Sequence, residues 1–161
     1  MANDHIATYL NDHLAGSVVA VELMQDLEAA YVEASIATFI AGLRAEVEAD
    51  VQELKRIMSR LEISESRTRK ASAWLTEKFT ELKLRLDDPV HGNLRLFESL
   101  EALSLGIEGK KGLWQALAAA AEVTPGLQIA DYEALKNRAE DQRSRVETKR
   151  LEAAKATLKL E

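Results

Sequence analysis

Acidic residues at helical spacing are the part of this sequence best able to do chemistry. Glu46 and Asp50 are four residues apart, and Glu108 and Glu140 fall in two later stretches with a helical pattern. Residues three or four apart share one face of a helix, and carboxylates suit hard or borderline divalent cations. If these helices pack together, the four carboxylates could bind a divalent metal ion. The alternative is a solvated acidic surface beside lysine and arginine side chains.

A second set of polar residues falls on the expected core-facing positions of four different helices. Its members are His13, Asp50, Lys110 and Gln142. The pattern predicts a polar layer in the centre of a helical bundle, where burial raises the pKa of a lone carboxylate and lowers that of a lone lysine. The alternative is a simple charge pair between Asp50 and Lys110. Three scattered histidines support no Ser-His-Asp arrangement, so we predict no catalytic residue, no cofactor and no bound metal.

Three glycines, Gly106, Gly109 and Gly112, recur at intervals of three in one expected helix. Each costs roughly 1 kcal/mol relative to alanine in a helix interior. Glycine is tolerated where another helix or a bulky side chain approaches closely, and we expect that here. The alternative is room for a ligand beside Gly106 and Ala49, which would make the protein a small-molecule binder with a central cavity.

The elements that must position these residues are all helical. Apolar residues recur three and four apart, which is typical of helices packed along their length. The chain has two prolines and seven glycines in 161 residues, too little turn chemistry for a β protein. We therefore predict one all-α domain over residues 1–161, with helices at about 4–31, 35–61, 65–86, 94–121 and 130–158.

The helices predict a four-helix bundle with an additional helix, 65–86, in its long second connection. The segment from residue 61 to residue 94 is long enough to cross the bundle from end to end. Helices 35–61 and 94–121 could then run parallel, as in the ferritin-type connection.

Composition limits the class of partner. The formal net charge is −6, and charged residues make up 30% of the chain. Net acidity argues against nucleic acid as the main partner. The sequence has no cysteine, as is compatible with the cytosol. It also has no apolar run of about 18 residues, so we expect no membrane span and a cytoplasmic location. We expect no secretory signal in the acidic N-terminal segment.

The stretch Ser104–Leu117, reading SLGIEGKKGLWQAL, resembles the third helix of bacterioferritins, whose pattern there is roughly ALELDGAKNLREAI. Residues Asn11–Val18 are similar to the start of the family's first helix, and Glu46–Asp50 lies where the family has Glu-x-x-His. The resemblance covers four of the five expected helices. It implies a ferritin-like fold, whose members commonly pair through helix faces.

The same resemblance implies that the di-iron site is degenerate. A ferritin-like site uses one Glu from each of two helices and Glu-x-x-His from each of the other two. Carried over by position, the two single glutamates would fall at Val18 and Gly106, and the first pair at Glu46 and Ala49. The last pair would be Ala139 with Gln142, or Glu140 with Arg143. Neither contains histidine, so the resemblance argues against iron oxidation.

Three functional hypotheses follow. The first is a non-catalytic ferritin-like bundle that acts through protein contacts as a homodimer. The second is a metal-binding ferritin-like protein, for iron oxidation or storage, with an unorthodox site made of Glu46, Asp50, Glu108 and Glu140. The third is the small-molecule binder with a central cavity.

Overall fold

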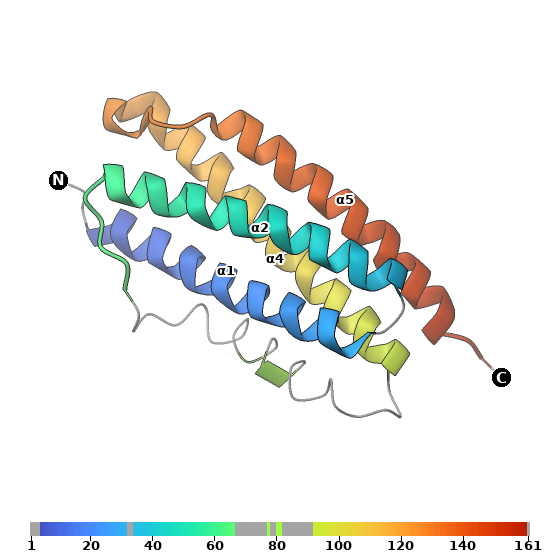
Figure 1. Ribbon diagram of the computed structural model, residues 1–161. Coiled ribbons are helices and arrows are strands. Elements are labelled where there is room, and N and C mark those ends of the chain that lie inside the picture. Colours follow the sequence, from blue (N-terminus) through green and yellow to red (C-terminus); the bar gives the residue numbers. More distant parts are fainter. Residues whose placement is uncertain (1–3, 32–33, 67–76, 78–79, 82–91, 161) are drawn as a thin grey trace.

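The computed structural model describes residues 4–31, 34–66, 77, 80–81 and 92–160. Four long helices dominate these residues: α1 (Asp4–Ala30), α2 (Ala34–Arg60), α4 (Gly92–Val123) and α5 (Tyr132–Thr157). A short 3-10 helix, η2 (Pro125–Leu127), links α4 to α5. Within the described parts of the chain there is no strand, so the expected all-α bundle is confirmed (Figure 1). The bounds lie within two residues of the expected ranges.

Most of the additional helix expected at 65–86 lies outside the described residues. Within that range, Glu77, Thr80 and Glu81 are helical, whereas Glu65 and Ser66 are not. The side chain of Asn11 on α1 contacts the non-helical residues at the start of that range. Its amide donates to the Ser64 carbonyl at 3.2 Å, and its oxygen accepts from the Ser66 amide at 2.6 Å. These bonds tie residues 64–66 to α1.

Local chemistry sets two other boundaries. At the end of α2 the Ile63 amide donates to the Met58 carbonyl and the Glu62 amide to the Ser59 carbonyl, which is a Schellman motif. Glu62 takes the left-handed position that glycine usually fills, with φ at 58°. At the start of α5, the Asp131 carboxylate accepts from the Ala134 amide at 2.9 Å and caps the helix.

The helices form two antiparallel pairs, α1 with α2 and α4 with α5, and between the pairs the backbones of α1 and α4 approach most closely. Figure 1 shows α2 and α4 running in the same direction. The C-terminal ends of α2 and α4 therefore lie at the same end of the bundle as the start of α1, which we name the first end. No described helix is long and apolar enough to cross a membrane.

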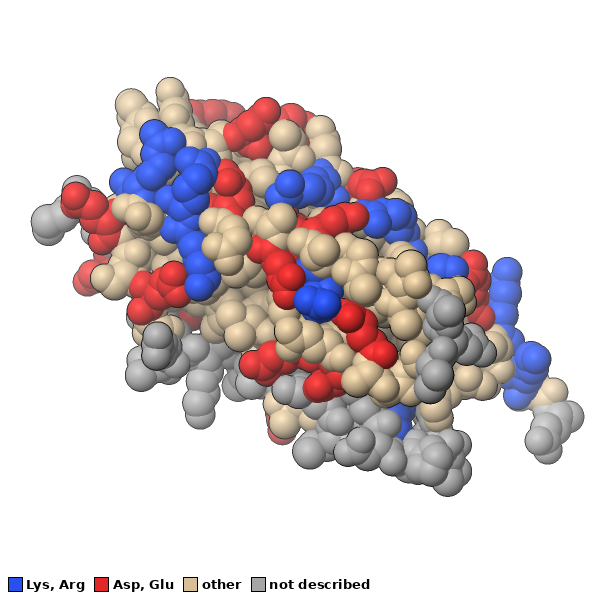
Figure 2. All heavy atoms as spheres, in the orientation of Figure 1, with Lys and Arg blue, Asp and Glu red and all other residues tan. Residues whose placement is uncertain are grey.

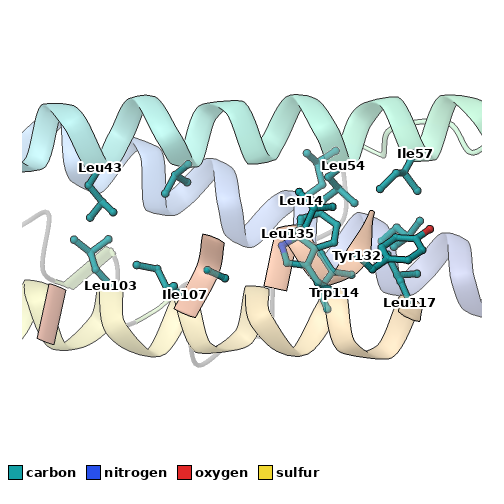
Figure 3. Packing of buried hydrophobic residues seen from close by; sticks show 14 of the residues in the cluster. Leu14, Leu43, Leu54, Ile57, Leu103, Ile107, Trp114, Leu117, Tyr132 and Leu135 are labelled. Carbon is teal, nitrogen blue, oxygen red and sulfur yellow. The ribbon is translucent and has the colours of Figure 1, made fainter. Parts of the chain in front are cut away.

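The core lies along the axis between the helices. Leu43, Leu54 and Ile57 on α2 point toward Leu103, Trp114 and Leu117 on α4 (Figure 3). All six are at most 3% exposed. Burying each such side chain contributes about 1.5–3 kcal/mol, so this apolar seam holds the two helix pairs together.

The expectation that the α4 glycines permit close packing is wrong at two positions. A Cβ atom added at Gly109 or Gly112 would meet nothing within 4 Å. Gly109 faces solvent and Gly112 is half-buried. No neighbouring helix requires glycine at either position, and nothing else in the structure explains them.

Candidate functional site: a buried ion-pair network

The middle of the bundle contains charged and polar side chains from three helices. Asp50 on α2, Lys110 on α4 and Gln142 on α5 are 2%, 9% and 0% exposed. The Lys110 ammonium donates to the Asp50 carboxylate at 2.5 Å and to the Gln142 side-chain oxygen. The Gln142 amide in turn donates to Asp50 at 3.1 Å. We refer to Asp50, Lys110, Gln142 and the adjoining Arg138 as the central network.

Arg138 completes the network from its solvent side. Its guanidinium donates to the second oxygen of Asp50, while its own side chain is 41% exposed. The sequence analysis missed this residue. Arg138 lies one helical turn before Gln142 on α5, and residues four apart share a helix face. That spacing is the signal that could have identified it.

The electrostatics of the network follow from burial. Burial lowers the pKa of the Lys110 ammonium below its ordinary value, and the nearby Asp50 carboxylate offsets part of that effect. Asp50 has a cation on each side of it, and Gln142 bridges Lys110 and Asp50. The network is therefore a closed set of partners in which both buried charges are compensated.

His13, the fourth residue expected in the polar layer, lies elsewhere. Its ring contacts the edge of the Tyr9 ring on α1, with 4.7 Å between centroids and 75° between planes. Burial lowers the pKa of His13, and the Asp12 carboxylate acts in the opposite direction. The structure thus brings together three of the four residues and places the histidine outside the group.

The other proposed metal-binding carboxylates each lie beside a cation. Glu46 accepts from Arg145 at 2.6 Å, and Glu140 accepts from Lys111 at 2.8 Å. Glu108 lies 3.1 Å from Lys111 and 3.2 Å from Arg143. The hydrogen bond from Lys111 lowers the pKa of Glu140. Every one of the four carboxylates, Asp50 included, thus has a protein cation as a partner.

These carboxylates do not form a common cluster. Among the residues that the structure describes, no group of three or more histidines, aspartates and glutamates is arranged to hold a metal ion. The arrangement favours ion pairs between helices. Figure 2 shows acidic and basic side chains interspersed over the visible face of the molecule.

The central cavity expected beside Gly106 and Ala49 is not supported at Ala49, whose side chain faces solvent. A pocket of about 760 Å³ lies instead at the first end of the bundle. Its lining comes from α1, from the ends of α2 and α4, and from η2. Sequence periodicity could not reveal it, because it forms where helix ends meet and not along a helix face.

Comparison with known proteins gives no match. No protein-family model, no curated protein and no solved structure is similar to this chain. Function must therefore be argued from the side chains themselves.

Proposed function

We propose that this protein is a non-catalytic, ferritin-like helical bundle that acts in the cytoplasm through protein–protein contacts, as a homodimer. The position of Lys110 carries this proposal. In a ferritin-like protein the metal ions lie between the four helices, among carboxylates. Here the Lys110 ammonium lies at the middle of the bundle, 2.5 Å from the carboxylate of Asp50. A metal cation at Asp50 would have to displace a built-in cation.

The outer surface is then the part of the molecule left to act. Two large apolar side chains are exposed on the neighbouring helices α1 and α4: Val18 is 44% exposed and Leu105 is 53% exposed. At the end of the bundle opposite the first end, the Tyr31 hydroxyl donates to the Gly92 carbonyl at 2.6 Å. Val18 lies thirteen residues before Tyr31, and Leu105 lies thirteen residues after Gly92. Because both helices rise by the same distance per residue, Val18 and Leu105 lie at the same level along the antiparallel helices α1 and α4.

We propose that the exposed Val18 and Leu105 side chains, which we name the Val18 and Leu105 face, contact a second copy of the chain. Exposed apolar side chains on neighbouring elements are what helix-face contacts bury. A two-fold contact also presents the same patch on both subunits. Charged side chains elsewhere already pair within the chain, as Lys111 does with Glu140 and Arg145 with Glu46, and Figure 2 shows acidic and basic side chains interspersed over the visible face.

Sedimentation equilibrium over a range of concentrations tests the homodimer. We expect a mass twice that of the 17.8 kDa chain. Val18→Glu and Leu105→Glu should each weaken association at least tenfold, about 1.4 kcal/mol. The matched control is Leu151→Glu on α5, where the leucine is 47% exposed. A monomer at every concentration, or equal weakening by all three variants, would contradict the proposed contact.

Metal content tests the non-catalytic part of the proposal. Protein from iron-supplemented cells, assayed by elemental analysis before and after mild chelation, should contain almost no iron, zinc or manganese. One or two metal ions per chain, lost in Glu46→Ala or Glu140→Ala, would favour the carboxylate metal site instead. The control variant is Glu133→Ala, which removes an exposed α5 carboxylate that pairs with Lys136.

A further inference from the structure

The pocket at the first end has a buried apolar part and an exposed polar part. Leu117 and Leu127 are buried at 3% and 6% exposure, and Ile6, Leu61 and Ala120 are partly buried beside them. The exposed lining residues are mainly polar and include His5, Tyr9, Arg60, Glu62 and Thr124. A volume of about 760 Å³ falls within the range of roughly 300–1,000 Å³ that is typical of small-molecule sites.

The polar groups at the mouth have unused hydrogen-bonding capacity. One guanidinium nitrogen of Arg60 donates to the Ile129 carbonyl at 3.3 Å, and that is its only hydrogen bond within the described residues. Guanidinium has five N–H donors, so most of them remain open. The Glu62 carboxylate has no partner in the described part of the chain. The mouth thus offers both donors and acceptors to a bound molecule.

Glu62 also occupies a backbone conformation that costs free energy. Its φ of 58° is left-handed, which costs a non-glycine residue about 1–2 kcal/mol. The Schellman motif requires that conformation but does not require glutamate, because glycine serves better there. Strained residues of this kind cluster at ligand sites. Glu62 therefore puts a carboxylate at the pocket mouth, in a strained conformation where helix termination alone would favour glycine.

From these observations we infer that the pocket at the first end binds a neutral, largely apolar small molecule with one hydroxyl or amide head group. The apolar lining takes the body of the molecule. Arg60 and Glu62 carry opposite charges, so the mouth favours neither an anion nor a cation, and it satisfies a head group that both donates and accepts. This inference is independent of the proposed function, since the pocket is distinct from the Val18 and Leu105 face.

A fluorescence titration with the neutral dye N-phenyl-1-naphthylamine tests the site. We expect saturable binding with one dye per chain. Ala120→Trp fills the pocket and should weaken binding at least tenfold. The matched control is Ala119→Trp, because Ala119 is the exposed neighbour on α4 and does not line the pocket. Circular dichroism of both variants checks that they fold. Binding that is absent, or equally affected by both substitutions, would overturn the site.

Displacement of the dye tests the class of ligand. Decanol, decanoate and decylamine share one chain length and differ in head-group charge. We expect decanol to displace the dye at a concentration at least several-fold lower than either charged compound. If decanoate or decylamine displaces it as well as decanol does, the neutral head group is wrong. A further variant, Arg60→Gln, leaves only the negative charge of Glu62 at the mouth and should therefore reduce the preference for decanol over decylamine. An unchanged preference would show that Arg60 is not part of the site.

Discussion

The Lys110 ammonium on α4 and the Asp50 carboxylate on α2 lie 2.5 Å apart, although the two residues are sixty positions apart in sequence. This pair joins the two helix hairpins at the centre of the bundle. Its members are not equivalent, because Asp50 also contacts Arg138 and Gln142, whereas Lys110 has no other anion as a hydrogen-bond partner among the described residues. The first prediction rests on that asymmetry.

Asp50→Ala should destabilise the protein more than Lys110→Met does. Removing Asp50 leaves the Lys110 charge buried without compensation, which typically costs about 3–5 kcal/mol. Removing Lys110 leaves Asp50 paired with Arg138, and methionine fills much of the vacated volume. Urea unfolding followed by circular dichroism measures both free energies of unfolding. Equal losses, or a larger loss for Lys110→Met, would show that Asp50 is not the organising charge.

His13 should make the free energy of unfolding fall as the solution becomes acidic. Burial holds the folded-state pKa of His13 below its ordinary value of 6.5, so the unfolded chain binds the proton first as pH falls. The contribution of neutral His13 is complete above the unfolded pKa and is lost as pH falls through 6.5 toward the folded pKa. His13→Gln should flatten the dependence between about pH 7 and pH 5. Urea unfolding at a series of pH values across this range measures the slope, and an unchanged slope in His13→Gln would contradict the prediction.

Asn11 and Ser99 are both buried polar residues, yet their substitution by alanine should have opposite consequences. Asn11→Ala removes the two bonds that hold residues 64–66 against α1 and should cost about 1–3 kcal/mol. The buried Ser99 hydroxyl has no hydrogen-bond partner in the part of the chain that the structure describes, so Ser99→Ala should leave stability unchanged or raise it by up to about 1 kcal/mol. Thermal and urea unfolding of the two variants decide this. A clear loss of stability in Ser99→Ala would reveal a bond absent from the structure.

Glu62→Gly should stabilise the protein by about 1 kcal/mol, because glycine adopts the left-handed conformation of this position without the steric cost. Ser59→Gly, three residues earlier and still within α2, is the control and should destabilise by about 0.5–1 kcal/mol. The midpoint of urea unfolding compares them. Destabilisation by Glu62→Gly would mean that its side chain makes a stabilising contact.

Gly109→Ala should raise the free energy of unfolding by about 1 kcal/mol, because alanine is the better helix former and its Cβ meets no atom within 4 Å. Gly112→Ala should act in the same way, and since the two positions are neighbours on one helix face, the double variant measures any coupling between them. Unfolding curves of the three variants provide the measurement. A loss of stability at Gly109 would point to a partner that covers this face of α4 in the assembly.

The sequence predicted the helices well because apolar periodicity and breaker residues are local signals. The spacing of Leu100, Leu103 and Ile107 identifies α4, and Thr124-Pro125-Gly126 identifies where it stops. The same periodicity predicted that Asp50, Lys110 and Gln142 face the core. In the structure their side chains are buried there and hydrogen-bond to one another.

Other features depend on relations that no helical pattern encodes. His13 satisfied the seam pattern, but α1 is only partly covered near its middle, so the ring lies beside Tyr9 instead. Asn11 hydrogen-bonds to residues more than fifty positions away in the sequence. A local pattern cannot reveal such a contact, and residues 65 and 66, where a helix was expected to begin, are not helical. The end pocket arises where four segments meet, which the pattern of any one segment cannot show.

The pairing of α1 with α2 and of α4 with α5 has a consequence for how the chain folds. Each hairpin joins neighbours in sequence, and local contacts of this kind form quickly. Joining the hairpins closes a much longer loop between residues 60 and 92, with an additional entropic penalty. Docking of two preformed hairpins is therefore the expected slow step. The Asp50 and Lys110 charges, one on each hairpin, select the register in which they dock.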